Sequence, residues 1–211
     1  MTSQTASDWN NRYVQGDTPW DNNLPDSQLQ RVLTEFELRP SRVLELGCGT
    51  GTNAVFLAQQ GFAVTAMDIA PLAIAKAQSR AQAAGVAIDF SAGDILECPA
   101  PAEPFPLVFD RGVYHCVRRV SAEGFCRKVA DATAPGGLYF TVAGNANEAE
   151  AAAEGPPRVT AEELCREFSP LFDLVLLREA RFDPVEINGK LDQPLCWAAL
   201  WRRKTVGSSG G

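Results

Sequence analysis

The sequence predicts an α/β fold in which a doubly wound, mostly parallel sheet of seven strands ends in an antiparallel strand at its C-terminal edge. Three observations predict this fold. Short apolar runs alternate with segments of helical periodicity between residues 43 and 168. A glycine-rich turn joins the first apolar run to the helix that follows it. The last two apolar runs follow each other with no helix between them, so they can pair antiparallel.

The N-terminal region is predicted to hold two helices. Residues 7–15 form a short helix that carries Trp9 and leads into residues 16–21, a cluster of turn-forming residues that contains Trp20. A second, amphipathic helix is predicted where apolar residues recur at helical spacing: Leu29, Val32, Leu33 and Phe36. Because exposed tryptophans are costly, Trp9 and Trp20 are expected to cover the end of the sheet, to close over a ligand, or both.

The central βαβ unit follows. Residues 43–46 are typical of a buried parallel strand, residues 54–58 have helical spacing, and residues 62–67 are a second buried strand that Asp68 closes. Between the first strand and the helix lies Gly47-Cys48-Gly49-Thr50-Gly51. Residues without a side chain at this position let a ligand approach the backbone at the carboxyl end of a strand.

The remaining elements continue the alternation. In order they are a helix over 71–84, strands over 86–90 and 106–109, a helix over 121–132 capped by Ser121, a strand over 138–143, a helix that Thr160 begins, and strands over 171–181 and 195–203. Residues 144–159 are too long for a plain connection and are predicted to be a lid or a mobile loop. We expect one domain over 1–206, with N-terminal helices that cover the ligand, and a flexible tail over 207–211.

A nucleoside-like ligand is the first functional hypothesis. Asp68 follows Gly47 by about 20 residues, where dinucleotide-binding proteins place the acid that hydrogen-bonds a ribose hydroxyl. Their pattern, G-x-G-x-x-G/A, has Thr52 in its last position here, which weakens NAD and FAD. Asp94 follows the third strand as Asp68 follows the second, so it can reach the same edge and accept from an adenine amino group. A tight turn without a ligand and a helix cap for Asp94 are the alternatives.

The charge and hydropathy of the chain exclude several classes of protein. The 211 residues include 19 basic and 26 acidic ones, a net charge of -7, with no basic stripe, which disfavours a nucleic-acid partner. No apolar stretch approaches the roughly 18 residues of a membrane span, and the polar N-terminal segment is unlike a signal peptide. We therefore expect a cytoplasmic protein without a membrane partner.

Six cysteines are scattered singly, with no C-x-x-C pair and one histidine in the whole chain. This spacing suggests neither a zinc site nor a disulfide framework, and no metal is predicted.

Two motifs resemble those of class I S-adenosylmethionine-dependent methyltransferases: E-L-G-C-G-T-G resembles motif I, and V-T-A-M-D-I-A resembles the second strand with its acid. Almost the whole chain further resembles the thiopurine and halide/thiol methyltransferase family. Three motifs carry this likeness, W-x-x-R-Y-x-x-G-D-T-P-W-D at residues 9–21, F-D-R-G at 109–112 and Gly155-Pro156-Pro157.

The resemblance implies a Rossmann-like fold and S-adenosyl-L-methionine as cofactor. Trp9 and Trp20 would border the cofactor, Asp68 would hold its ribose, and Asp94 with Ile95 would flank its adenine. Gly47 and Gly49 are assigned from the wider superfamily pattern. The complete set of implied cofactor contacts is Trp9, Trp20, Glu45, Leu46, Gly47, Gly49, Asp68, Ile69, Asp94, Ile95, Asp110 and Arg111.

The resemblance also implies a small-molecule acceptor, with a thiol or another sulfur nucleophile expected first. Methyl transfer from a sulfonium depends mainly on in-line alignment, and a guanidinium would raise the thiolate fraction of an acceptor. Arg111 is therefore predicted to be catalytic as the anion-stabilising group, with an ion pair to Asp110 or Asp94 as the alternative. His115 is predicted to deprotonate or hydrogen-bond the acceptor, or else to be a wall residue with a satisfied ring. Tyr114 is a weaker candidate for that wall.

Other functions remain to be separated from this one. The sequence after the fourth strand, D-R-G-V, lacks the D/N-P-P-Y/F of DNA adenine methyltransferases, and Asp110 alone is too few carboxylates for a metal-dependent O-methyltransferase. A metal-free O- or N-methyltransferase of natural-product metabolism and a catalytically inactive cofactor-binding regulatory module remain open. We expect a monomer.

Overall fold

The computed structural model describes residues 5–148, 157–187 and 190–205. The main sheet has the strand order β3-β2-β1-β4-β5-β10-β7, and β6 pairs with β5 beside this path. Its strands are β1 (Arg42–Leu46), β2 (Ala63–Asp68), β3 (Asp89–Ala92), β4 (Phe105–Arg111), β5 (Thr133–Asn145), β6 (Arg158–Val159), β7 (Phe172–Arg181) and β10 (Leu195–Arg203). A separate hairpin consists of β8 (Val185–Ile187) and β9 (Lys190–Asp192). The helices are α1 (Ala6–Gln15), α2 (Ser27–Glu35), α3 (Thr52–Gln59), α4 (Pro71–Ala84), α5 (Tyr114–Ala132) and α6 (Ala161–Phe168).

The predicted doubly wound, mostly parallel sheet is confirmed. Strands β1 to β5 pair in parallel, and their register sets Leu46 beside both Met67 and Asp110. The carboxyl ends of β1, β2 and β4 therefore meet at one edge. The C-terminal strand β10 is antiparallel to both of its neighbours, but it lies between β5 and β7, so β7 is the outer strand of the antiparallel pair.

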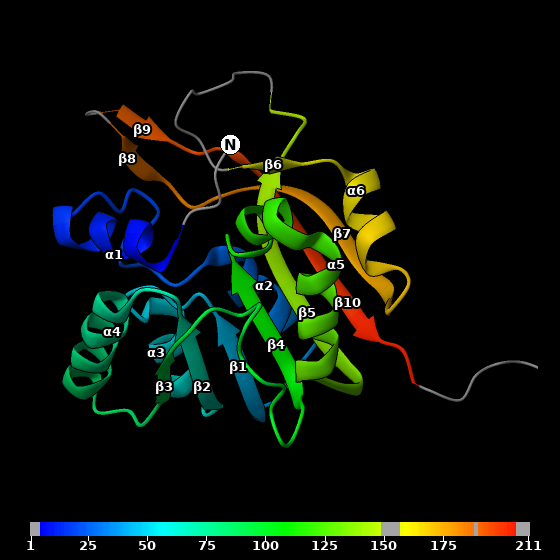
Figure 1. Ribbon diagram of the computed structural model, residues 1–211, viewed down its shortest axis with the longest axis horizontal. Coiled ribbons are helices and arrows are strands. Elements are labelled where there is room, and N and C mark those ends of the chain that lie inside the picture. Colours follow the sequence, from blue (N-terminus) through cyan, green and yellow to red (C-terminus); the bar gives the residue numbers. More distant parts are fainter. Residues whose placement is uncertain (1–4, 149–156, 188–189, 206–211) are drawn as a thin grey trace, which may run out of the picture.

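Helices cover both faces of the sheet, as apolar residues alternate along its strands (Figure 1). On one face α5 and α6 pack over a core that includes Val108 and Trp201. On the other face α2, α3 and α4 pack over a core that includes Phe109 and Leu200. Neighbouring residues of one strand thus belong to different cores, which is the burial pattern expected of a central strand in a three-layer fold.

Helix α5 begins at Tyr114, whereas the sequence predicted a start at Ser121. Ser121 has φ -156° and ψ 97°, so it breaks the helix, and its Oγ accepts a hydrogen bond from Gly124 N (3.0 Å). Ser121 therefore caps the second half of α5, as predicted. The first half, from Tyr114 onward, was missed because its charged and β-branched residues lack a clear apolar stripe.

Two elements lie at the carboxyl edge of the parallel strands, α1 and the β8–β9 hairpin (Figure 1). The hairpin was not predicted. Of the predicted lid over 144–159, residues 149–156 lie outside the described residues. Its first two residues belong to β5 and its last two form β6. The tail over 207–211 lies wholly outside the described residues. No helix in the described part of the chain is long and apolar enough to cross a bilayer.

Candidate active site

The glycine turn after β1 is shaped by three residues with positive φ. Gly47, Gly49 and Gly51 have φ values of 63°, 54° and 82°. A Cβ on Gly47 would lie 2.1 Å from Cγ2 of Val113, and one on Gly51 would lie 2.8 Å from Cβ of Ala77. Side chains are therefore excluded here both by the backbone conformation and by close packing, which leaves the main chain of the turn as its accessible surface.

Asp68 fixes the glycine turn against the end of β2. Its Oδ2 accepts a hydrogen bond from Gly49 N (2.8 Å), and its Oδ1 accepts one from Ala70 N (2.9 Å). Burial raises the pKa of Asp68, and the two backbone hydrogen bonds oppose this rise. Each carboxylate oxygen keeps a second lone pair, so Asp68 can accept further hydrogen bonds from a ligand at the turn.

Glu45 is the least satisfied acid at this edge. Its side chain is 1% exposed, and its Oε2 has no hydrogen-bond partner among the described residues. Burial raises the pKa of Glu45 to about 8, hydrogen bonding from Asn53 opposes this, and the charges of Asp68, Asp26 and Asp110 add to it. A buried carboxyl with one oxygen unbonded, placed among other acids, favours a cationic ligand, since a positive charge would lower the cost of ionising it.

The pKa of Glu45 predicts how stability changes with pH. Because the folded pKa of about 8 exceeds the ordinary value of 4.5, the folded protein holds a proton that the unfolded chain has lost between these pH values. Stability from this group is therefore present below pH 4.5 and falls as the pH rises toward 8, by at most about 1.4 kcal/mol per pH unit. Denaturant unfolding at several pH values should show this slope in the wild type and a shallower one in Glu45→Gln. Equal slopes would contradict the raised pKa.

An N-terminal cover, defined as residues 6–26, lies over the glycine turn. Tyr13 is buried, and its hydroxyl lies 3.1 Å from where a Cβ of Gly49 would be. The ring of Trp20 meets Tyr13 and Trp9 edge to face, with centroid distances of 6.2 and 5.5 Å. Both tryptophans are half-buried, and the guanidinium of Arg12 lies 4.3 Å from the ring centroid of Trp20. One cation is thus already stacked on this indole.

The cover is fastened to the turn by a second set of contacts. Thr50 Oγ1 donates to Asp21 Oδ2 (2.6 Å), which joins the turn to the end of the G-D-T-P-W-D motif. From α4, Arg80 Nε donates to Thr50 O (2.9 Å), and its Nη2 donates to Asn23 Oδ1 (2.6 Å). The segment that contains Trp20 is therefore attached to the glycine turn and to α4.

Arg111 holds the same segment from the other side. Its Nε donates to Asp26 Oδ2 (2.9 Å), and its Nη1 donates to the carbonyl oxygen of Trp20 (3.1 Å). The guanidinium lies 5.1 Å from the ring centroid of Phe182. The ion-pair partner of Arg111 is therefore Asp26, and neither Asp110 nor Asp94. These two hydrogen bonds use two of the five guanidinium N–H groups.

Asp110, which the resemblance implies as a cofactor contact, uses its carboxylate within the protein. The side chain is fully buried; its Oδ1 accepts from Val113 N (2.9 Å) and Tyr114 N (3.0 Å), and its Oδ2 accepts from Tyr139 Oη (2.5 Å). These bonds satisfy the start of α5 and tie it to β5. The carboxylate of Asp110 therefore has a structural role, and a contact between Asp110 and a cofactor stays a prediction.

His115 is buried and neutral. Its Nδ1 accepts a hydrogen bond from Gly144 N (2.8 Å), so the remaining proton is on Nε2. Burial, with the positive charges of Arg111 and Arg119, lowers the pKa of His115 to about 3. With its acceptor nitrogen occupied, His115 is suited to donate a hydrogen bond rather than to remove a proton. This matches the predicted wall residue with a satisfied ring.

The single histidine makes this state directly measurable. We expect the ¹⁵N NMR spectrum of the folded protein to show one fixed Nε2–H tautomer from pH 5 to pH 8, without titration, because the folded pKa lies near 3. In denaturant the same residue should titrate near its ordinary pKa of about 6.5. A midpoint between pH 6 and 7 in the folded protein would contradict the assignment.

The remaining predicted contacts lie around the same edge. Asp94 Oδ1 accepts from Leu96 N (2.9 Å), which is the cap role named as its alternative, and Ile95 packs against the α5 core. Ile69 is half-buried beside Asp68. The side chain of Leu46 is fully buried, so only its main chain can contact a ligand.

No role was predicted for Asp26, for Phe182 or for the Tyr13 hydroxyl. Asp26 directly precedes an amphipathic helix, and its Oδ1 accepts from Leu29 N (2.9 Å), so an N-cap pattern would have found that part of its role. No local pattern could have found its pairing with Arg111, because 85 positions separate the two residues.

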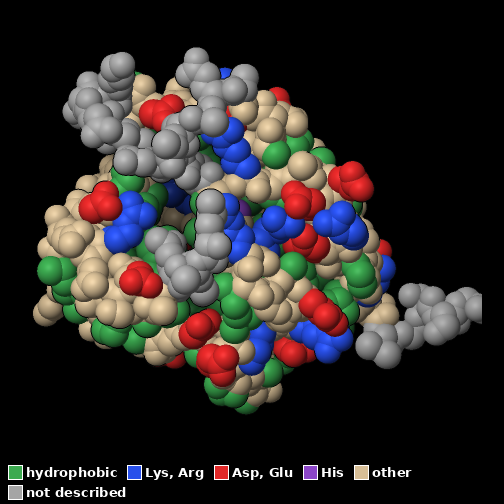
Figure 2. All heavy atoms as spheres, turned by 45° about the horizontal axis from the view of Figure 1, so that its top comes forward, with side chains coloured by type: hydrophobic (Ala, Val, Ile, Leu, Met, Phe, Trp, Pro, Cys, Tyr) green, Lys and Arg blue, Asp and Glu red, His purple; other side chains and the backbone are tan. Residues whose placement is uncertain are grey.

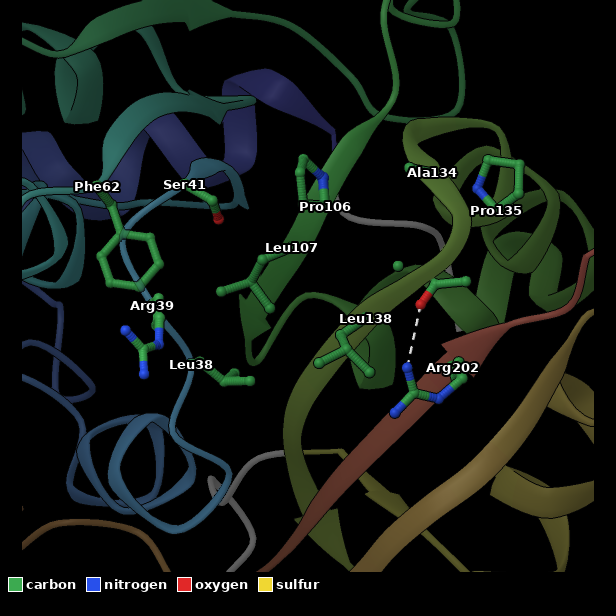
Figure 3. A pocket seen from close by; sticks show the side chains of 12 residues that line it. Leu38, Arg39, Ser41, Phe62, Pro106, Leu107, Ala134, Pro135, Leu138 and Arg202 are labelled. Atoms are coloured by element: carbon green, nitrogen blue, oxygen red, sulfur yellow. Dashed lines mark hydrogen bonds between the residues drawn. The ribbon is translucent and has the colours of Figure 1, made fainter.

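The face above the strand ends is hollowed near its centre, and blue basic side chains gather along the hollow (Figure 2). A separate cavity of about 390 Å³ lies where the parallel strands begin, lined by apolar residues such as Leu38 and Phe62 and by Arg202 (Figure 3). It contains none of the predicted site residues. We place the site at the carboxyl edge, because the glycine turn, the acids and His115 converge there.

Comparison with known proteins finds relatives over parts of the chain. Residues 43–137 match the family model described as "Methyltransferase domain". The chain is 26% identical over 147 residues to 2-heptyl-1-hydroxyquinolin-4(1H)-one methyltransferase of Mycobacteroides abscessus, covering 69% of this chain and 64% of that protein. It is 36% identical over 98 residues to a ubiquinone biosynthesis O-methyltransferase of Methylobacterium sp. (46% and 39%), and 25% identical over 143 residues to probable thiol methyltransferase 2 of Arabidopsis thaliana (67% and 63%). The chain thus spans less than two thirds of these curated relatives.

Solved structures share the fold over most of the chain. One is titled "Conversion of a Disulfide Bond into a Thioacetal Group during Echinomycin Biosynthesis"; it has a TM-score of 0.81 at 24% identity and covers 97% of this chain and 94% of its own. Another is the Burkholderia thailandensis 1,6-didemethyltoxoflavin-N1-methyltransferase with bound 1,6-didemethyltoxoflavin and S-adenosylhomocysteine (TM-score 0.72, 20% identity, 95% of this chain and 87% of that chain covered). Residues 43–137, which contain the glycine turn, Asp68 and Arg111, are thus similar to methyltransferase domains, and the chain shares the fold of these solved structures.

Proposed function

We propose that the protein transfers a methyl group from S-adenosyl-L-methionine to a small-molecule acceptor, most favourably a thiol or another sulfur nucleophile. The observation that carries this proposal is the convergence of a side-chain-free turn, the Asp68 carboxylate and the unpaired Glu45 Oε2 at one sheet edge. Each suits one part of that cofactor. The turn would admit a nucleoside, and Asp68 could accept from its ribose hydroxyls. The net positive charge of the cofactor would favour ionisation of Glu45, which its raised pKa keeps protonated near neutral pH in the free protein.

The other predicted contacts complete the proposed cofactor site. Asp94 and Ile95 would border the adenine, Trp9 and Trp20 would cover the ligand, and Gly47, Gly49, Leu46 and Ile69 would offer main-chain atoms. Bound S-adenosylmethionine supplies a methyl group already activated on a sulfonium, so the task of the chain is to align the acceptor and exclude water.

Arg111 and His115 are the proposed acceptor-side residues. Both act as hydrogen-bond donors: Arg111 through guanidinium N–H groups not used by Asp26 and Trp20, and His115 through Nε2–H. A guanidinium beside a thiol, whose ordinary pKa is about 8.5, would raise its thiolate fraction. The resemblance of the chain to a probable thiol methyltransferase supports this choice of acceptor.

A product assay tests the proposal. The protein is incubated with methyl-labelled S-adenosylmethionine and one acceptor in each reaction: thiophenol, hydrogen sulfide, iodide, selenite, tellurite, phenol or an arylamine. Methylated products are identified by mass spectrometry. We expect thioanisole from thiophenol, and lower turnover in Arg111→Gln. Transfer only to phenol or the amine would overturn the sulfur acceptor.

An O- or N-methyltransferase is the second candidate, favoured by the O-methyltransferase relatives and by the toxoflavin N-methyltransferase structure. A regulatory module is the third. Calorimetric binding of S-adenosylhomocysteine without turnover of any acceptor would favour the module, and absence of binding at millimolar concentration would remove all three. Four statements stay predictions from the sequence: a single domain over 1–206, a monomeric state, a cytoplasmic location, and the absence of nucleic-acid and membrane partners.

A further inference from the structure

We infer that Asp26 is a positioning residue for methyl transfer, which sets the acceptor side of the site by holding Arg111 and, through Arg111, the backbone of Trp20. This inference rests on the proposed function for its kinetic consequence, but its structural part can be tested without activity. No part of the proposed chemistry uses Asp26 directly, although it is one of the most deeply buried acids in the described chain.

The contacts of Asp26 show why it can fix Arg111. One oxygen, Oδ1, accepts from Leu29 N (2.9 Å) at the start of α2, and its backbone N–H donates to Asn53 Oδ1 (2.8 Å) on α3. Asp26 is thus fixed to two helices before it meets Arg111. Its other oxygen, Oδ2, then accepts from Arg111 Nε at 2.9 Å, with the two side chains 1% and 15% exposed. A charge-assisted bond at this depth is poorly screened by solvent.

The far side of Arg111 carries this restraint to the site. Its Nη1 donates to the carbonyl oxygen of Trp20 (3.1 Å), and its face packs on the ring of Phe182, 5.1 Å away. Between Trp20 and Asp26 the chain is also bonded to the glycine turn, through Asp21 and Thr50. The segment from Trp20 to Asp26 is therefore bonded to the glycine turn through Asp21 and to the guanidinium of Arg111 through the Trp20 carbonyl and the Asp26 carboxylate.

The first test follows the position of Trp20 in the absence of ligands. Labelling with 5-fluorotryptophan should give four ¹⁹F resonances, one for each tryptophan, and Trp20→Phe identifies the relevant one. We expect Asp26→Asn and Arg111→Gln each to shift the Trp20 resonance and the double variant to add nothing beyond Arg111→Gln. Asparagine keeps the N-cap, so α2 should remain folded.

A matched control is available in the same helix start. Asp183 Oδ2 accepts from Ser27 N (2.9 Å), so Asp183→Asn alters a similar acid-to-backbone bond and leaves the hydrogen bonds of Arg111 to Asp26 and Trp20 in place. It should leave the Trp20 resonance unchanged. An unmoved resonance in Asp26→Asn, or effects of Asp26→Asn and Arg111→Gln that sum in the double variant, would overturn the inference.

The second test uses thiophenol as acceptor and S-adenosylhomocysteine as cofactor probe. In Asp26→Asn we expect kcat/KM for thiophenol to fall about tenfold to a hundredfold, the usual effect of losing one charged hydrogen bond. The calorimetric Kd for S-adenosylhomocysteine, which Trp20 would cover, should rise by a clearly smaller factor. In an Arg111→Gln background the same substitution should have no further effect on kcat/KM. Equal losses in cofactor affinity and turnover would mean that Asp26 is merely structural. If thiophenol is not methylated at all, the proposed acceptor fails, and the fluorine result still decides the role of Asp26.

Discussion

Gly47→Ala is expected to destabilise the protein by about 3 kcal/mol or more and to abolish cofactor binding. A left-handed backbone costs a non-glycine residue about 1 to 2 kcal/mol, and the new methyl group would lie 2.1 Å from Cγ2 of Val113. Because valine is stiff about χ1, relief requires a shift of the turn between β4 and α5, which adds the cost of an overpacked site. Chemical denaturation and calorimetry with S-adenosylhomocysteine measure the two effects.

Gly85 provides the matched control for this substitution. It has a similar φ of 66°, but a Cβ there would meet nothing within 4 Å. Gly85→Ala should therefore destabilise the protein only by the cost of a left-handed backbone at alanine, about 1 kcal/mol. Adding Val113→Ala to Gly47→Ala removes the clashing methyl group. The extra loss of unfolding free energy in Gly47→Ala, relative to Gly85→Ala, should then be recovered. If Gly47→Ala is no worse than Gly85→Ala, close packing against Val113 is not what requires a glycine at this position.

Asp68→Ala is expected to weaken binding of S-adenosylhomocysteine by at least about a hundredfold. The substitution removes the carboxylate proposed for the ribose and also leaves Gly49 N and Ala70 N without their acceptors, so the turn loses its attachment to β2. Calorimetry gives the change in Kd. Asp89→Ala is a suitable control, since Asp89 is exposed and lies at the opposite end of the neighbouring strand β3. A change below tenfold in Asp68→Ala would exclude the proposed role of this acid.

The fold could be predicted from the sequence wherever one local signal dominated. Helix α4 and strand β10 were predicted with the bounds that the structure has, because a proline and a glycine delimit the helix and a long apolar run defines the strand. The capping box at Thr160 is present, with Glu163 N bonded to its hydroxyl at 3.1 Å. In contrast, the strand order around β10 depends on pairing between distant segments, which no local pattern encodes.

The part of the candidate site around the glycine turn was predictable from the sequence, and the part around Arg111 was less so. The glycine turn and Asp68 come from one βαβ unit, so their spacing in the sequence carries their geometry. The roles of Asp110 and Arg111 depend instead on which way each side chain leaves β4 and on which distant group meets it. Asp110 faces Tyr139 in the interior, whereas Arg111 meets Asp26, and this alternation is set by strand phase together with tertiary packing.

The place of β10 inside the sheet has a consequence for the order in which the protein can assemble. The ribosome makes the chain from its N-terminus, so β1 to β5 can pair before residues 195–203 exist, but β7 has no neighbour until β10 arrives. Until then the backbone N–H and C=O groups of β5 that face β10 have no strand to pair with. The core also lacks Trp197 and Trp201, which are buried in the finished fold. Completion of the fold therefore waits for the last strand to be synthesised, and a nascent chain arrested before residue 195 should be sensitive to proteases.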